Sequence, residues 1–232
     1  DGGQLNRVFN ITGAGNGGSF TAMTIQNGRI ATGNGGGIYA GGAVTLTNVA
    51  VLTNTTSSGS GGGLYAGGAV SLTNASFISN TANANNADVL GGGLYAGGAA
   101  SISGGAFANN WARMTGSGAN TWARGGAIYA AAALNMTSAQ VNSNGVYVRY
   151  TTAYGTNGQG GGVYAGGTAT LRATHFMTNA VQSYSNVVSQ NAYASGGGLY
   201  AAGAASMDGG SFAGNTANVY MSALNYGSAS GA

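Results

Sequence analysis

The segment that decides the fold runs from Gly61 to Asn80 and reads GGGLYAGGAVSLTNASFISN. Within it, the aromatic Tyr65 separates the apolar residues Leu64 and Ala66. In the same way, the polar Ser71 separates Val70 and Leu72. Alternation with a period of two is typical of a strand that buries one face. The segment therefore predicts two short strands whose apolar side chains point inward and whose intervening side chains point outward.

This segment recurs along the chain. The string Gly-Gly-(Gly/Ala)-(Ile/Leu/Val)-Tyr-Ala occurs six times, and its tyrosines are Tyr39, Tyr65, Tyr95, Tyr129, Tyr164 and Tyr200. Fifteen residues after each tyrosine stands an asparagine: Asn54, Asn80, Asn110, Asn144, Asn179 and Asn215. Only the segment from each asparagine to the next tyrosine varies, and it grows through 11, 15, 19, 20 and 21 residues. One corner of each repeat therefore carries an insertion that lengthens along the chain.

A single repeat of this kind cannot bury its inward face, whereas repeats stacked about 4.8 Å apart form continuous apolar columns. The repeat predicts an all-β fold, a right-handed parallel β-helix of about seven coils, with the hand following the general preference of parallel crossovers. We expect one domain over residues 1–232. It comprises degenerate first coils at 1–34, six regular repeats at 35–215, and a lead-in at 216–232 to a missing or partner-supplied coil.

The recurring asparagine has a structural interpretation. It follows each Phe-x-x or Val-x-x unit, where the chain must turn, and asparagine tolerates the left-handed backbone region. Its amide can also bond neighbouring backbone and the amides of adjacent coils. We therefore expect a buried or half-buried asparagine ladder at this corner, with the asparagine itself turning the chain.

Composition limits the classes of function. All six cations are arginine and only three residues are acidic, a net charge of +3. A nucleic-acid partner needs clustered cations, which this sequence lacks, so none is predicted. The longest apolar run, around Ala127 to Met136, is half the length of a membrane-spanning helix, so no transmembrane segment is predicted. Low charge and abundant Gly, Ser, Thr and Asn favour a secreted protein.

The repeat motifs resemble a known family. Gly62-Gly63-Leu64 with Phe77-Ile78-Ser79-Asn80 is similar to the repeats of polymorphic outer-membrane proteins and of related autotransporter passengers of bacterial surfaces. The resemblance extends over nearly the whole chain. It implies a right-handed β-helix at the cell surface or secreted from the cell, with an adhesive or structural role.

Catalytic chemistry on such a fold requires clustered carboxylates. Asp1 and Asp88 fall in different coils and at different positions of the repeat. Asp208 has the same repeat position as Arg172 one coil earlier, and we interpret this pair as a surface ion pair, which is worth at most about 1 kcal/mol. The sequence therefore predicts no enzyme.

The one histidine, His175, is expected beside Gln140 and Ser211 of the adjacent coils. A triad with Asp208 is an alternative, but no oxyanion donor accompanies it, so we interpret His175 as a surface histidine. One histidine and no cysteine exclude a conventional zinc site, and no cofactor is predicted.

The six tyrosines are expected to stack on one outward face, which is the candidate interaction face. Two interpretations stay open: the lengthening insertions fold over the tyrosines, or the tyrosines dock a second protofilament, a sugar or a cell surface. A second outward face carries serine and threonine, for example Ser71 and Thr73. We interpret it as a solvated face rather than an ice-binding one.

Neither end of the sequence shows a helix, a proline or a charge cluster that would block strand pairing. The chain is then either a fragment of a longer solenoid or a subunit that stacks head to tail on copies of itself. We expect an extracellular structural protein that assembles into a filament through open β-helix ends, with lateral bundling as a further option. The alternative is a monomeric adhesin that binds glycan or a host surface through the tyrosines, and a remote alternative is a polysaccharide-active enzyme.

Overall fold

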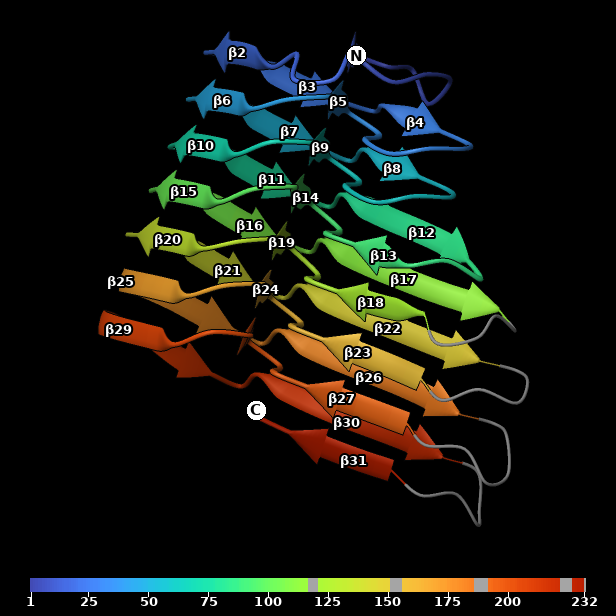
Figure 1. Ribbon diagram of the computed structural model, residues 1–232, viewed down its shortest axis with the longest axis vertical. Coiled ribbons are helices and arrows are strands. Elements are labelled where there is room, and N and C mark those ends of the chain that lie inside the picture. The colour runs from blue at the N-terminus through green and yellow to red at the C-terminus, as the bar shows by residue number, and fades with distance from the viewer. Residues whose placement is uncertain (117–120, 151–155, 186–191, 222–226, 232) are drawn as a thin grey trace.

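Each strand of the molecule pairs in parallel with a strand one coil away, which makes a stack of strands along the long axis (Figure 1). This computed structural model describes residues 1–116, 121–150, 156–185, 192–221 and 227–231. The described residues contain strands and no helix. The chain is thus all-β and forms the predicted right-handed parallel β-helix.

Sheet 1 holds the six tyrosines. It has seven strands in the order β1 (Phe9–Ile11), β5 (Ile38–Ala40), β9 (Leu64–Ala66), β14 (Leu94–Ala96), β19 (Ile128–Ala130), β24 (Val163–Ala165) and β28 (Leu199–Ala201). The tyrosines are direct register partners from β5 to β28. In β1 the partner of Tyr39 is Asn10. The repeat offsets therefore predict the register of this sheet correctly.

Sheet 2 has two limbs that meet at a corner. The first limb comprises β2 (Gly18–Thr21), β6 (Val44–Thr47), β10 (Val70–Thr73), β15 (Ala100–Ser103) and β20 (Leu134–Thr137). The second limb comprises β3 (Thr24–Gln26), β7 (Ala50–Leu52), β11 (Ser76–Ile78), β16 (Ala106–Ala108) and β21 (Gln140–Asn142). The limbs are joined by β25 (Ala169–Met177) and β29 (Ala205–Ala213), which span both.

The lengthening insertion builds two more sheets, at the right of Figure 1. Sheet 3 comprises β4 (Arg29–Ile30), β8 (Thr55–Thr56), β12 (Thr81–Asn85), β17 (Trp111–Gly116), β22 (Gly145–Tyr150), β26 (Ala180–Ser185) and β30 (Thr216–Met221). Sheet 4 comprises β13 (Val89–Leu90), β18 (Trp122–Arg124), β23 (Thr156–Gln159), β27 (Ala192–Ser195) and β31 (Gly227–Ser230). The added residues therefore extend the solenoid sideways.

Two hydrophobic cores result from this arrangement. The main core lies between sheets 1 and 2 and includes Leu64, Leu72 and Phe77, all fully buried. A second core lies between sheets 3 and 4 and contains Met114 and Tyr150, also fully buried. The described parts of the insertion bury the side chains of this second core against each other, and Arg124 of the insertion lies against the ring of Tyr164. The other five tyrosines stay partly exposed, so the interpretation that the insertions fold over the tyrosines does not hold for these five.

The predicted asparagine ladder is present at the corner between sheets 2 and 3. Its six members are between 0% and 6% exposed. The Oδ1 atom of each asparagine from Asn80 to Asn215 accepts both the backbone N–H and the side-chain Nδ2–H of the asparagine one coil earlier, over 2.8 to 3.0 Å. At the first coil, Asn54 Oδ1 accepts from Gly28 N over 2.7 Å. The ladder therefore satisfies polar groups of every coil that it crosses.

One detail of the predicted corner is wrong. The left-handed residue is the one before each ladder asparagine, with φ between 51° and 62°, and these residues are Thr53, Ser79, Asn109, Ser143, Thr178 and Gly214. The ladder asparagine keeps a negative φ, because its side chain must point into the corner and reach the coils on both sides. At each corner one residue thus turns the chain, and the asparagine that follows it forms the ladder.

The first residues of the chain lie along one edge of the solenoid. Gly2 N donates to Gln26 O over 2.9 Å, Gln4 N donates to Asn27 O over 2.8 Å, and Arg29 N donates to Asn6 O over 3.0 Å. Residues 1–7 therefore cover part of the edge formed by β3 and β4, an edge that the sequence alone predicts to be bare.

Candidate interaction surface

The six tyrosines of sheet 1 form a continuous stack on its outward face, which we call the tyrosine ladder. Adjacent ring centroids are 4.4 to 5.4 Å apart, and the ring planes differ by 1° to 6°. Because each inner ring has both faces covered by its neighbours, the ladder presents ring edges and phenol hydroxyls to the outside. Five of the six tyrosines are partly exposed and Tyr164 is buried, at 8% exposure, so the exposed part of the ladder is a row of phenol edges at coil spacing that is interrupted at Tyr164.

Burial in the ladder changes the acidity of Tyr95 and Tyr129. The pKa of Tyr95 is raised to about 12, first because burial disfavours the charged phenolate and then because Tyr65 and Tyr129 add further negative charge when ionised. Burial raises the pKa of Tyr129 as well, and the nearby Arg124 acts in the opposite direction. The phenols of Tyr95 and Tyr129 therefore stay neutral, and able to donate hydrogen bonds, well above physiological pH.

Two arginines flank the ladder. The Arg7 guanidinium lies 5.2 Å from the Tyr39 ring centroid and donates to Gly35 O over 2.8 Å, which fixes it at the first ring. The Arg124 guanidinium lies 5.0 Å from the Tyr164 ring centroid. Since Arg124 belongs to β18, this contact shows that the outward faces of sheets 1 and 4 adjoin each other.

A groove of about 400 Å³ lies over the outward face of sheet 4. It is lined by Trp122, Asn157, Gln159, Tyr193 and Ser195, from the adjacent strands β18, β23 and β27. Three of these residues, one from each strand, are register partners in one column. This volume lies within the range of small-molecule sites in proteins.

Neither Arg124 nor the groove was predicted from the sequence. The sequence does contain a signal for them. The residues seven positions before Tyr129, Tyr164 and Tyr200 are Trp122, Asn157 and Tyr193. The residues five positions before the same tyrosines include Arg124 and Gln159. Positions counted forward from each tyrosine lose their alignment inside the insertion, whereas positions counted backward keep it.

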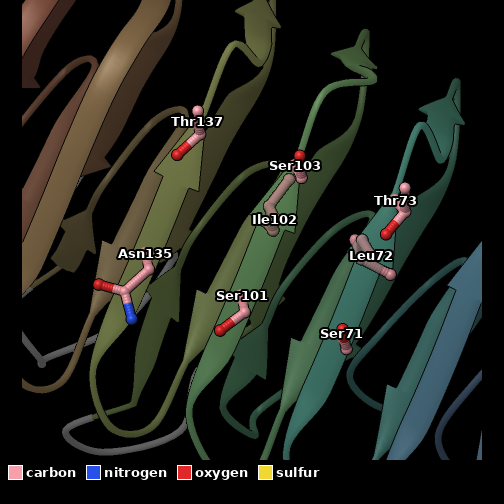
Figure 2. Close-up of a pocket in the computed structure, with 8 residues that line it drawn as sticks. All are labelled: Ser71, Leu72, Thr73, Ser101, Ile102, Ser103, Asn135 and Thr137. Carbon is pink, nitrogen blue, oxygen red and sulfur yellow. The ribbon is translucent and has the colours of Figure 1, made fainter.

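The serine- and threonine-bearing face of sheet 2 is hollowed as well (Figure 2). A depression of about 240 Å³ lies over β10, β15 and β20, and the side chains of Ser71, Ser101 and Asn135 follow one another in register along it. Hydroxyl and amide groups project from this face in Figure 2. The surface offers polar groups but no aromatic ring and no charge.

The charged and titratable candidates lie on β25 and β29. Arg172 and Asp208 are register partners as predicted, but within the described ranges no ion pair joins them. His175 Nδ1 and Ser211 Oγ are 2.9 Å apart and hydrogen-bonded, on an exposed strand face. Within the described chain, no hydrogen bond links Asp208 to His175. His175 and Ser211 of the alternative triad are therefore in contact, whereas Asp208 does not join them.

The described residues include no group of three or more side chains of the types His, Cys, Asp and Glu that could bind a metal ion. They also include no helix of the length and apolar character that crossing a membrane requires. Comparison with known protein families, curated proteins and solved structures finds no match to this chain.

Proposed function

We propose that the protein is an extracellular, non-catalytic adhesive scaffold that binds a polysaccharide along the tyrosine ladder. The observation that supports this most is the unbroken row of six phenol rings, held at 4.4 to 5.4 Å by backbone pairing of the strands beneath them. A polysaccharide also repeats its hydroxyl groups at regular intervals. A rigid row of hydroxyls needs no ordering on binding, which favours affinity.

The resemblance of the Gly-Gly-Leu and Phe-x-x-Asn motifs to repeats of polymorphic outer-membrane proteins and autotransporter passengers supports the same proposal. Those proteins act at bacterial surfaces, and this chain has the low charge and high Gly, Ser and Asn content expected of a secreted β-helix. We therefore propose that the protein acts outside the cell or on its surface.

Retention on insoluble polysaccharides tests the proposal. Tyr95→Phe combined with Tyr129→Phe removes two hydroxyls while keeping the ring stack. Each hydrogen bond contributes about 1 kcal/mol, so we expect retention of the double variant on cellulose, chitin or mannan to weaken about tenfold or more. Tyr184→Phe is the control, because Tyr184 stacks on Tyr220 in sheet 3, away from the ladder. Equal retention of wild type and double variant would contradict the proposal.

A second candidate is end-to-end assembly into a filament. In β29, Met207 and Phe212 are 41% and 42% exposed, although their register partners Leu171 and Phe176 are at most 1% exposed. A further coil laid on this edge would bury them, and we propose a second copy of the chain as its source. Residues 1–7 cover part of the opposite edge and would have to move aside.

Electron microscopy of the purified chain tests the filament. We expect fibres from the wild type and short rods from Met207→Ser combined with Phe212→Ser, because serine removes the apolar surface that a stacked coil would cover. Rods alone in the wild-type sample, at all concentrations tested, would exclude assembly by this edge.

A further inference from the structure

The groove over sheet 4 combines aromatic rings and amides in an order set by the coils. Trp122, Asn157 and Tyr193 occupy one column, so the two aromatic residues are separated by two coils, or about 9.6 Å from the usual strand separation. This distance corresponds to about two linked sugar rings. The amide of Asn157 lies between the two aromatic side chains.

The aromatic rings of the groove differ from those of the ladder, because no described ring stacks on the faces of Trp122 and Tyr193. Tyr193 is 44% exposed and has no ring or cation contact with any described residue. Trp122 has one face against the Arg124 guanidinium, at 4.1 Å from the ring centroid, and no stacked ring among the described residues on the other. An open aromatic face is the surface on which the C–H groups of a pyranose ring pack.

Polar groups in the groove are available to a ligand. Asn157 is 8% exposed as a residue, and its side-chain amide forms no hydrogen bond with a described residue. Gln159 uses its Oε1 to accept from Arg124 Nε over 2.9 Å, which leaves its amide N–H groups to donate. The Asn157 amide lines the groove without a protein partner, so a ligand hydroxyl can bond it without displacing an existing protein hydrogen bond.

The charges beside the groove are balanced and engaged. Arg124 is held by Gln159 and by the rings of Trp122 and Tyr164. The Asp88 carboxylate accepts the backbone N–H of Trp122 over 2.7 Å. These opposite charges offset each other, which favours a neutral ligand over an acidic or a basic one.

We propose that this groove is a binding subsite for a neutral, pyranose-based glycan, with Tyr193 and Trp122 packing on sugar rings and Asn157 bonding a sugar hydroxyl between them. The inference rests on the proposed function, since it assumes that the protein binds glycan, and it names the ligand class. The adjoining ladder then extends the contact of a longer polymer through Arg124 towards Tyr164.

Isothermal titration calorimetry tests the subsite, with cellohexaose and maltohexaose as neutral probes and hexagalacturonate as an acidic probe. Tyr193→Ala and Asn157→Ala are each expected to weaken binding of the preferred neutral probe about tenfold. Tyr220→Ala is the matched control, because Tyr220 is 43% exposed but lies on sheet 3. Unchanged melting curves establish that all three variants fold.

The outcomes separate this inference from the proposed function. Binding of neither neutral probe, tighter binding of hexagalacturonate, or wild-type affinity in both groove variants would overturn the subsite. If groove variants lose affinity while the ladder variant Tyr95→Phe with Tyr129→Phe keeps full retention on insoluble polysaccharide, the subsite stands and the role proposed for the ladder fails. If only the ladder variant loses retention, the proposed function stands without this subsite.

Discussion

The side-chain Nδ2 of Asn80 donates a 3.0 Å hydrogen bond to Oδ1 of Asn110, which lies 30 residues further along the chain. The same Oδ1 accepts the backbone N–H of Asn80 over 3.0 Å. Asn110 in turn donates from Nδ2 to Phe77 O over 2.8 Å and to Asn144 Oδ1 over 2.9 Å. One buried amide thus joins three successive coils, and the ladder couples their stability.

Asn110→Ala is expected to destabilise the fold by about 3 kcal/mol, because the buried Asn80 N–H and Phe77 C=O both lose their partners. Urea unfolding followed by circular dichroism measures the change. Asn135→Ala is the control, since Asn135 is an exposed residue on the outward face of β20, and we expect a change within about 0.5 kcal/mol. Similar losses in both variants would show that the ladder does not stabilise the coils.

Gly91→Asn is expected to be far more disruptive than Gly214→Asn, although both glycines have a positive φ, 69° and 62°. A Cβ atom at Gly91 would lie 2.0 Å from Leu94 O, whereas at Gly214 the nearest atom would be 3.4 Å away. The corner of Gly214 also accepts Asn109 in an earlier coil. Thermal unfolding of the two variants compares them, and an equal loss of stability would mean that backbone strain rather than close approach decides both sites.

Alkaline pH is expected to destabilise the tyrosine ladder. The pKa of Tyr95 is about 12 in the folded chain against an ordinary value of 10.0. The unfolded phenol therefore ionises first, so the stabilising contribution is complete below pH 10, declines as the pH rises towards 12, and is lost above it. Tyr95→Phe should lose less stability than wild type over this interval.

Urea midpoints over this pH series, with tyrosinate absorbance as the second readout, measure the effect. Asn135→Ala removes no titrating group and should follow the wild type. Identical pH dependence of wild type and Tyr95→Phe would contradict the raised pKa.

The main solenoid could be predicted from the sequence because six copies of one motif keep constant offsets. Leu64 and Leu94, or Phe77 and Phe107, occupy the same offset and are register partners. A slip of one residue would turn the apolar side chains outward, and the constant offsets of the six repeats fix which residues pair. The same offsets predicted the asparagine ladder, and the ladder differs only in which residue turns the chain.

Sheets 3 and 4 could not be predicted as easily. Their insertion changes length at each coil, and alignment from the preceding tyrosine fails inside it. The second core around Met114 and Tyr150 exists because the insertion folds back on itself, which no single repeat reveals. The groove of Trp122 and Tyr193 depends on that fold-back, so its geometry could only be found in the structure.

The stacking of coils in register, on which the ladders and the groove depend, is tested most directly by engineered disulfides, since the chain has no cysteine of its own. Ser71 and Ser101 are register partners on the outward face of sheet 2, whereas Ser71 and Ser103 are offset by two residues. Offset partners are about 8 Å apart, too far for a disulfide. We predict that Ser71→Cys with Ser101→Cys forms an intramolecular disulfide under mild oxidation and that Ser71→Cys with Ser103→Cys keeps free thiols. Cross-linking of the offset pair in preference to the register pair would contradict the account.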